Sequence, residues 1–505
     1  MTTSVTCGKD RESDPSGPPQ TQYGWPHQGN RNRSHVAGRP SGSCFVRSSH
    51  RGNHVAKLGV SPWRLPLVGN AWHLLVHPLT FLRQQRELGD IVEFRHGNRR
   101  VYFVNDPVLA HEVLTGQRAN FPKGGPVINA ARALGRNGLS TTTDESLHHR
   151  QRRLMQPLFH HSRFPAYIAA MRETVEEITS SWREGEKVRI DSVAYQISSA
   201  VLSRCLFSGK LGSNATRDFM TLYPSVVGGI GRRATLPMPW LHRLPTAANR
   251  RYTRDLATIH RVTDQLIADH AAGDETYDDI LSALLEARDD DTGKTMSESQ
   301  VHDEVVTLIS AASETTAQTL SWALRVLAKD TELDRRVAAE LQGVLANRAP
   351  RHQDLQELPL LSAVVSETLR LYPPLWLVSR YVPNETELGG VLLRAGSEVY
   401  ISAFANHHDA ELFPSPEVFD VTRWLPGAPT PGRGAYIPFG MGTRKCIGNE
   451  FALAELMTTL AIFLQRWRLS PQHGGRLSKP KVAFTYGTGP FTLVASQRRS
   501  GPPEH

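Results

Sequence analysis

The sequence contains a glycine-rich loop around one cysteine, Phe439-Gly440-Met441-Gly442-Thr443-Arg444-Lys445-Cys446-Ile447-Gly448. The glycines let the backbone fold tightly around a single sulfur atom. A helix expected from about Asn449 directs its positive end at Cys446, and Arg444 places a positive charge close by. A thiolate that ligates iron needs backbone N–H donors and positive surroundings, so the loop predicts such a ligand. The alternative, a buried and inert cysteine, does not explain this spacing.

The composition excludes several classes of protein. The chain has 505 residues, 39% of them hydrophobic, which is enough for one large core with a tail. Cys7, Cys44 and Cys205 form no CxxC or Cys/His cluster, which argues against structural zinc and a disulfide scaffold. A free thiolate suits the reducing cytoplasm. There is no run of about 18 apolar residues and no secretory signal, so we expect no membrane span.

The basic charge gathers at the N-terminus. Residues 1–57 hold eight Lys or Arg against three Asp or Glu, in a chain whose net charge is +9. They show no helical or strand period, which predicts a disordered basic extension. Such a tail explains the charge without nucleic-acid binding, for which no motif is present. We expect the folded domain to span residues 58–497, with a flexible C-terminal tail over 498–505.

Hydrophobic periods predict a mainly α fold. Asp106 is the expected N-cap of a helix that ends near Thr115. Helical periods dominate from 139 to 329, and the clearest helix, over 297–329, is apolar nearly all round, so we expect it to be buried. Further helices are expected over 71–88, 360–371 and 449–467.

The predicted β region is small. Residues 91–95 and 100–104 alternate in polarity around Gly97-Asn98, which indicates a hairpin. Short strands are expected within 388–401. A long loop rich in Pro and Gly, 412–445, precedes the last helix, and loops of this length are usually functional.

The cysteine loop resembles the heme-binding signature of the cytochromes P-450. The resemblance covers about residues 60–495 and is to the soluble bacterial type. It implies the P-450 fold, heme b as cofactor, and Cys446 as the proximal ligand of its iron. It also implies that Phe439, Arg444 and Gly448 contact the cofactor, with Arg444 paired to one of its anionic groups.

A second motif resembles the same family. Glu367-Thr368-Leu369-Arg370 looks like the family's ExxR pair, and Arg423 stands where the family supplies a second arginine. The resemblance implies a buried structural network of Glu367, Arg370 and Arg423 that holds the cysteine loop. The alternative is an exposed ion pair on one helix face.

Basic residues elsewhere are candidates for binding the heme propionates. His148 and Arg152 lie four apart on a predicted helix, where the family often has Trp or His followed by a basic residue. Charge-assisted hydrogen bonds suit carboxylates, and Arg380 is a third candidate. The alternative for His148 and Arg152 is a solvated basic face.

Glu314 and Thr315, on the long helix, resemble the acid–alcohol pair that relays protons in this family. A buried core helix rarely carries a glutamate without a reason. The alternative is that the threonine bonds its own helix carbonyl and the glutamate pairs elsewhere. Ala312 stands where the family usually has glycine, and this narrows the neighbouring cleft by one methyl group.

Segments 121–126, 149–157 and 244–251 look like those of bacterial sesquiterpene oxygenases of the pentalenene oxygenase and epi-isozizaene oxygenase kind. This implies that the enzyme hydroxylates a small apolar terpene of secondary metabolism with O2. A macrolide, steroid or fatty-acid oxygenase, a peroxide-driven oxidant, and a heme-based gas or redox sensor remain alternatives. The expected substrate pocket comprises Leu308, Ala311, Ala312, Leu375, Trp376 and Leu377.

The sequence carries no flavin or iron–sulfur domain, so electrons must come from other proteins. The resemblance implies a ferredoxin and a ferredoxin reductase, supplied ultimately by NAD(P)H. A basic surface near Cys446, from Arg423, Arg433, Arg444 and Lys445, is expected to attract an acidic ferredoxin. We expect a cytoplasmic monomer.

Overall fold

The computed structural model describes residues 55–62, 64–66, 68–207, 210–236, 238–272, 279–289, 293–472 and 478–498. All of them belong to the compact unit Val46–His505. Of the predicted N-terminal extension only 55–57 are described, and of the predicted C-terminal tail only Arg498, so the rest of both segments lies outside the described residues. The N–H of Ala56 donates to the carbonyl oxygen of Gly389 at 2.7 Å.

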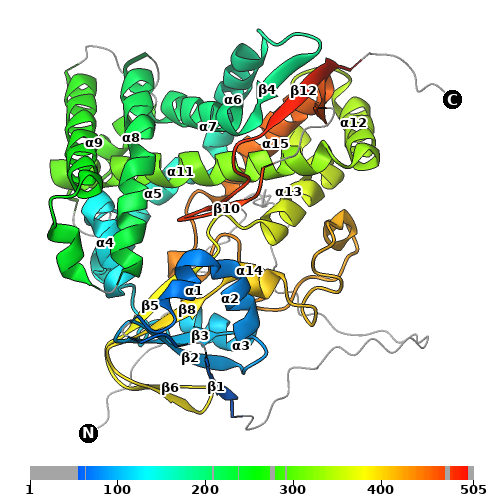
Figure 1. Cartoon of the computed structure of the whole chain (residues 1–505). Helices are drawn as coiled ribbons and strands as arrows, with labels where there is room; N and C mark the ends of the chain where they lie inside the picture. Colours follow the sequence, from blue (N-terminus) through cyan, green and yellow to red (C-terminus); the bar gives the residue numbers. More distant parts are fainter. Residues whose placement is uncertain are drawn as a thin grey trace, which may run out of the picture. The chain divides into compact units, whose positions relative to one another are not determined.

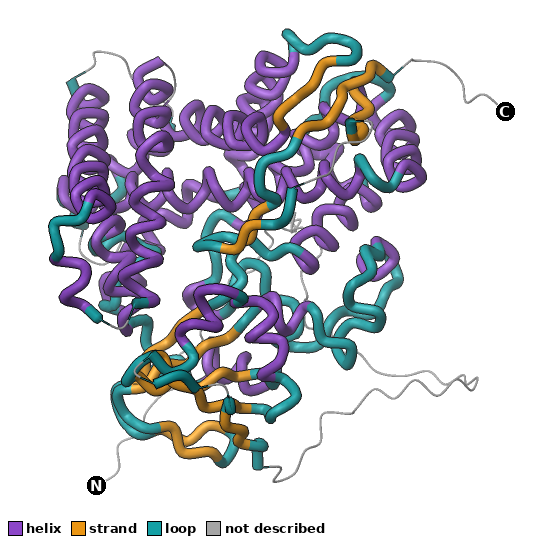
Figure 2. Tube along the Cα trace, viewed as in Figure 1, coloured by secondary structure: helices purple, strands orange, loops and turns teal. Residues whose placement is uncertain are grey.

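Helices make up most of the described chain (Figures 1 and 2), which confirms the predicted mainly α class. At the centre lies α11 (Glu298–Leu327), which contacts both α7 (Ile190–Phe207) and α15 (Asn449–Arg466). The remaining α-helices are α1 (Ala71–Val76), α2 (Pro78–Gln85), α3 (Pro107–His111), α4 (Gly125–Gly135), α5 (Glu145–Met155), α6 (Phe164–Thr179), α8 (Lys210–Thr235), α9 (Ala247–Ala271), α10 (Ile280–Glu286), α12 (Thr331–Leu345), α13 (Pro359–Leu371) and α14 (Ala403–His407).

The largest sheet lies beside α1 and α2 in the lower part of Figure 1. Its order is β1-β2-β3-β8-β5, and β2 and β3 form the predicted antiparallel hairpin. Its strands are β1 (Leu58–Val60), β2 (Ile91–His96), β3 (Arg99–Val104), β8 (Ser397–Ile401) and β5 (Val378–Val382). Smaller sheets join β4 (Glu186–Arg189), β12 (Thr492–Gln497) and β9 (Trp467–Pro471), then β6 (Thr386–Leu388) and β7 (Val391–Leu393), and finally β10 (Lys481–Val482) and β11 (Tyr486–Gly487).

The long central helix follows the sequence prediction closely. Ser297 caps it, and the side chain of Gln300 reaches back to the Ser297 N–H to complete a capping box. Most of its residues are buried, as expected for a helix that is apolar nearly all round. Ala311 is an exception, because it is exposed halfway along this buried helix. The helix therefore borders an accessible space at that point.

The helix predicted over 71–88 is wrong, because the chain forms two helices there. α1 ends at Val76 and α2 begins at Pro78, with His77 between them in a non-helical conformation at φ −137° and ψ 57°. A proline disfavours helical geometry in the residue before it and has no N–H for the preceding turn. The break therefore follows from Pro78, a local signal that the apolar period masks.

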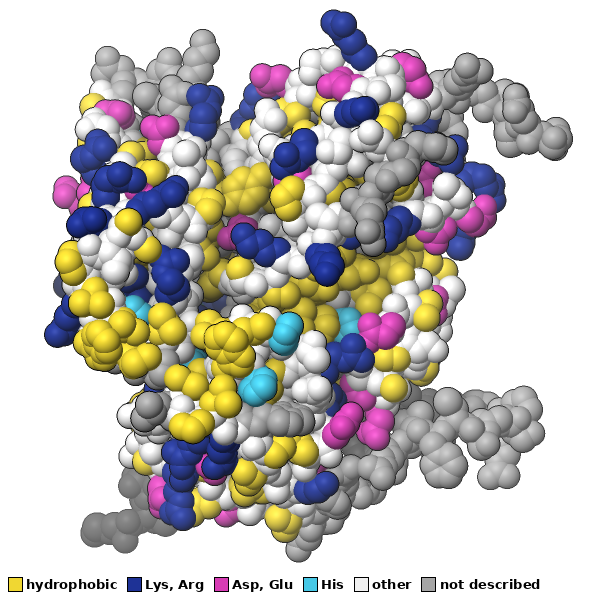
Figure 3. Space-filling model, in the orientation of Figure 1, with side chains coloured by type: hydrophobic (Ala, Val, Ile, Leu, Met, Phe, Trp, Pro, Cys, Tyr) yellow, Lys and Arg dark blue, Asp and Glu magenta, His cyan; other side chains and the backbone are white. Residues whose placement is uncertain are grey.

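None of the helices in the described ranges is long and apolar enough to cross a membrane. Hydrophobic side chains nevertheless gather on the surface over α1 and near the turn Pro239–Arg243, toward the lower left of Figure 3. Trp72 is 55% exposed and Trp240 is 59% exposed. Large exposed apolar side chains that lie together are typical of surfaces that contact apolar molecules.

Candidate active site

The loop around Cys446 is folded as its glycines require. The Cys446 N–H donates to the carbonyl oxygen of Phe439 at 2.9 Å, which closes the loop on itself. Gly440 and Gly442 have φ values of 69° and 70°, in the left-handed region that side chains disfavour. A Cβ atom on Gly442 would lie 2.1 Å from the carbonyl oxygen of Leu114. Glycine at 442 is therefore required both by its conformation and by the close approach of the neighbouring turn.

The thiol of Cys446 lies just before the N-terminus of α15. Its side chain is accessible, although the surrounding protein is dense enough that burial raises the pKa of the thiol. The Gly448 N–H hydrogen-bonds to it, and Arg152 and Lys445 add positive charge, and all three lower the pKa. These are the donors and charges that stabilise a thiolate ligand. Arg152 is held in place because its Nη1 donates to the carbonyl oxygen of Lys445 at 2.7 Å.

Several basic side chains converge next to this loop. Burial, Arg380 and Arg444 together lower the pKa of Lys123 to about 7. Burial and Arg444 lower the pKa of Arg380 to about 10. Burial, Arg444, Arg152, His149 and Lys123 lower the pKa of His148 to about 3. The buried Nδ1 atom of His148 has no hydrogen-bond partner among the described residues. The repulsion shows that this cluster has more positive charge than its protein neighbours balance.

One carboxylate lies within the cluster. Glu145 accepts a hydrogen bond from Nη2 of Arg444 at 2.7 Å, and Arg444 also donates to the Thr142 carbonyl oxygen at 3.1 Å. Arg380 donates to its neighbour, the carbonyl oxygen of Ser379, at 2.8 Å. The excess of cations over carboxylates fits a cofactor that brings carboxylates of its own, as heme does with its two propionates.

The sequence prediction found most of this cluster but missed Lys123. His148, Arg380 and Arg444 are brought together, and Arg152 lies close enough to His148 to lower its pKa while it also contacts the loop beside Cys446. Lys123 follows Phe121-Pro122 in a segment that runs beside β5, where the Tyr381 N–H donates to the Pro122 carbonyl oxygen at 3.0 Å. Lys123 lies in segment 121–126, which resembles a segment of the sesquiterpene oxygenases, but that resemblance does not say which side chains it meets, so its partners emerge only from the fold.

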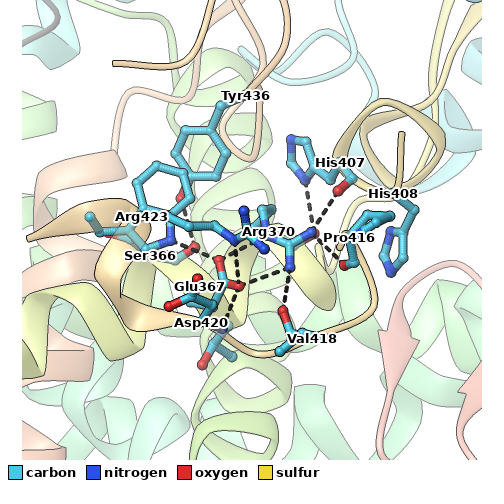
Figure 4. Close-up of polar contacts among 12 residues, drawn as sticks. Ser366, Glu367, Arg370, His407, His408, Pro416, Val418, Asp420, Arg423 and Tyr436 are labelled. Carbon is cyan, nitrogen blue, oxygen red and sulfur yellow. Dashed lines mark hydrogen bonds and ion pairs between the residues drawn. The ribbon is translucent and has the colours of Figure 1, made fainter. Parts of the chain in front are cut away.

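A buried ion pair on α13 ties the chain together (Figure 4). Nε and Nη2 of Arg370 donate to the two carboxylate oxygens of Glu367, each at 2.8 Å, and both side chains are 0% exposed. Glu367 also accepts the Asp420 N–H at 2.9 Å and the Trp424 indole N–H at 2.7 Å. Nε of Arg423 lies 3.5 Å from Glu367. The structure therefore brings together the three residues predicted to form a network, in the interior rather than on the surface.

The same network reaches the start of the cysteine loop. Nη1 of Arg370 donates to the carbonyl oxygens of His407 at 2.7 Å and Pro416 at 2.8 Å. Burial lowers the pKa of His407 to about 3, so its ring is neutral. Its Nδ1 donates to the Arg370 carbonyl oxygen at 3.0 Å, and its Nε2 accepts the Ile437 N–H at 3.0 Å. Ile437 lies two residues before Phe439, where the cysteine loop begins, so the network reaches the entrance of that loop.

Glu314 and Thr315 have separate partners. The Thr315 hydroxyl donates to the carbonyl oxygen of Ala311 at 2.7 Å, one turn back on α11. Glu314 accepts a hydrogen bond from the Thr485 hydroxyl at 2.6 Å. Burial raises the pKa of the Glu314 carboxyl, while Thr485 and Lys481 lower it. The contacts match the alternative geometry considered for this pair, and a hydroxyl that donates to a carbonyl can still accept a hydrogen bond.

The residues expected to line a substrate pocket differ in exposure. Ala311 is exposed and Ala312 is partly exposed, whereas Leu308 is buried. Leu375 is 42% exposed. Trp376 and Leu377 pack against the core that joins α1, α2 and the sheet. Of the six residues, Ala311 and Leu375 are therefore exposed, Ala312, Trp376 and Leu377 are partly exposed, and Leu308 alone is buried.

Comparisons with known proteins agree with this geometry. The family model "Cytochrome P450" matches residues 60–493. Cyclooctatin synthase of Streptomyces melanosporofaciens is 40% identical over 87% of this chain and 95% of its own. Pentalenene oxygenase of Streptomyces avermitilis is 33% identical over 89% of this chain and 99% of its own. A crystal structure of the cytochrome P450DA heme domain superposes with a TM-score of 0.78 at 24% identity, covering 88% of this chain and 99% of that one.

Proposed function

Because this chain belongs to the cytochrome P450 family and is a monooxygenase with heme iron, we propose that it hydroxylates a small apolar terpene of secondary metabolism. The reaction converts R–H, O2, two electrons and two protons into R–OH and water. Heme, when bound, supplies the oxygen activation. The protein's own residues hold the cofactor, orient the substrate and move protons.

The charge pattern beside Cys446 is the observation that supports heme binding and therefore the monooxygenase chemistry. Lys123, Arg380 and Arg444 form a positive surplus with Glu145 as their carboxylate neighbour, and the accessible thiol lies in the adjacent loop. We assign the cations to the two propionates of heme b and the thiolate of Cys446 to its iron. The Phe439 carbonyl oxygen accepts the Cys446 N–H and so holds the backbone of Cys446, while the Gly448 N–H donates to its sulfur.

Protons would be carried by two side chains of α11, Glu314 and Thr315. Glu314 is the partly buried carboxyl that can release and regain a proton, and Thr315 is the hydroxyl on the neighbouring face of the helix. General acid catalysis needs a group whose pKa lies nearer neutrality than that of an exposed carboxyl. The raised pKa of Glu314 supports this role.

The terpene assignment rests on the relatives and on an apolar lining. Pentalenene oxygenase is named for a hydrocarbon, and it matches nearly the whole folded part of this chain. The exposed side of α11 offers Ala311 and Ala312, with Leu375 also accessible. Such a lining holds a hydrocarbon by shape and apolar contact, because hydrocarbons form no hydrogen bonds.

Electrons would come from NAD(P)H through a ferredoxin reductase and a ferredoxin, to a monomer in the cytoplasm. Of the four basic residues expected to attract the ferredoxin, Arg433 and Lys445 are exposed. Arg423 and Arg444 are instead committed to Glu367 and Glu145. Two exposed cations attract an acidic ferredoxin less strongly than four would. The attraction should still weaken as the salt concentration rises.

A binding and turnover panel tests the function. The holoenzyme is titrated with a sesquiterpene hydrocarbon, a fatty acid, a steroid and a macrolide, and loss of the iron's water ligand is followed by absorption. Turnover is then measured with NADPH, a ferredoxin and its reductase. We expect the terpene to bind tightest and to yield a product heavier by one oxygen atom. Preferential conversion of another class, or tight binding without any turnover, would overturn the substrate assignment.

A further inference from the structure

One polar contact joins the C-terminal hairpin to α11. Thr485 is 4% exposed and lies in the turn between β10 and β11. Its hydroxyl donates to Oε1 of Glu314 at 2.6 Å, across 171 residues of sequence. Lys481, at the start of the hairpin, acts on the same carboxyl by its charge. The hairpin therefore supplies polar surroundings to a carboxyl that is partly withdrawn from solvent.

The geometry of α11 explains why Glu314 points toward the hairpin. Positions four apart share a helix face, so Glu314 lies in line with Gln318, and Ala311 lies in line with Thr315. The hairpin packs on the first face, where a Cβ atom on Gly487 would be 2.5 Å from Oε1 of Gln318. The second face borders the accessible space, because Ala311 is exposed. Glu314 thus sits between the hairpin and the face that carries Thr315.

Two tryptophans hold the turn that carries Thr485. The Trp376 indole N–H donates to the carbonyl oxygen of Ala483 at 3.0 Å. The Trp322 indole N–H donates to that of Tyr486 at 3.1 Å. Both sides of Thr485 are therefore fastened to other elements, and the position of its hydroxyl is determined by the core rather than by the turn alone.

We propose that Thr485 is a positioning residue that holds the anionic form of Glu314 and so governs the return of protons to the relay on α11. The inference rests on the proposed role of Glu314. In each cycle the carboxylate takes a proton from water and then releases it toward the face of Thr315. The Thr485 hydroxyl stabilises the anion left after release, because hydrogen bonds to charged acceptors are stronger than those to neutral ones. Burial and the charge of Glu314 raise the pKa values of Tyr195 and Tyr223, so both phenols are neutral beside it.

An infrared titration of the resting holoenzyme tests the contact without turnover. The Glu314 carboxyl band is assigned by its disappearance in Glu314→Gln, and its midpoint pH is measured in each variant. Thr485→Val removes the donor to the anion, so we expect the midpoint to rise by about one pH unit. Thr485→Ser keeps the donor and should restore the wild-type midpoint. An unchanged midpoint in Thr485→Val would overturn the proposal.

Thr488→Val is the matched control. Thr488 is 0% exposed, follows the same hairpin, and donates its hydroxyl to the Gly489 carbonyl oxygen at 2.8 Å. The Thr488→Val variant loses one buried hydroxyl that does not contact Glu314. The midpoint pH of the Glu314 carboxyl in this variant should therefore equal that of the wild type. If Thr485→Val does not fold, the comparison is made with Thr485→Ala. A shift of equal size in the control would show a general effect of hairpin packing and would overturn the proposal.

Coupling measurements separate this inference from the proposed function. We expect Thr485→Val to form less product per electron, with the optimum of the pH profile displaced upward like the carboxyl midpoint. A displaced midpoint with unchanged coupling would overturn the role of Thr485. Full coupling in Glu314→Gln would instead refute the proposed role of Glu314 itself, whatever the infrared result for Thr485.

Discussion

Replacing Glu367 by alanine should destabilise the fold by about 3–5 kcal/mol, because it leaves a buried charge without its partner. Arg370 is 0% exposed and donates two of its hydrogen bonds to Glu367. The substitution also removes the acceptor for the Asp420 N–H and the Trp424 indole, and each buried donor left unsatisfied costs about 1–3 kcal/mol. The cost of the unpaired charge and the cost of the unsatisfied donors overlap. We therefore expect a destabilisation near the upper end of about 3–5 kcal/mol rather than the sum of the two costs.

A second Glu–Arg pair of the same spacing provides the control. On α12, Nη2 of Arg335 donates to Oε1 of Glu332 at 2.8 Å, but these side chains are 69% and 64% exposed. Solvent screens such a pair, so Glu332→Ala should leave stability unchanged. Urea unfolding followed by circular dichroism compares both variants with the wild type. Equal unfolding midpoints for Glu367→Ala and Glu332→Ala would refute the reasoning, because burial would then have no energetic consequence.

Four further outcomes are expected. Cys446→Ser should lose heme, or lose the red-shifted absorption band of the reduced protein with carbon monoxide, and an unchanged band would rule out Cys446 as the ligand. Thr315→Ala should keep heme and substrate binding but release peroxide in place of product, whereas full coupling would assign the relay to another group such as Ser313. Lys123→Met should lower heme content. Since the pKa of Lys123 is lowered from 10.5 to about 7, folding of heme-free wild type should weaken as pH falls through that window. In thermal melts at several pH values, the melting temperature of Lys123→Met should depend less on pH than that of the wild type. An equal pH dependence would contradict the charge surplus. Removal of residues 1–54, which spares the buried Ala56 and the bonded Lys57, should leave turnover with ferredoxin unchanged, and both forms should slow as salt rises. Loss of activity on truncation would make the tail part of the enzyme, and salt-independent reduction would exclude electrostatic steering.

Local patterns determined much of what could be predicted. The cap at Asp106, where the carboxylate accepts the N–H groups of Val108 and Leu109, depends only on residues next to one another. The long helix α11 follows from a capping box and an uninterrupted apolar stretch. The hairpin of β2 and β3 follows from alternation around one turn. In each case the interacting groups are close in sequence, so their spacing alone specifies the geometry.

Long-range contacts were decided only by the tertiary structure. β4 interrupts a region predicted to be helical, because its partner is β12 near the C-terminus, where Leu493 pairs with Val188. Lys123 joins Arg380 because the loop before α4 runs along β5.

The sequence by itself identified Cys446 and its loop, the Glu367–Arg370 pair and the candidate relay on α11. Only the fold could bring Thr485 to Glu314, across 171 residues. A spacing of a few residues is fixed by helix or turn geometry, whereas a contact between distant segments depends on how the whole core packs, which leaves no periodic trace in either segment.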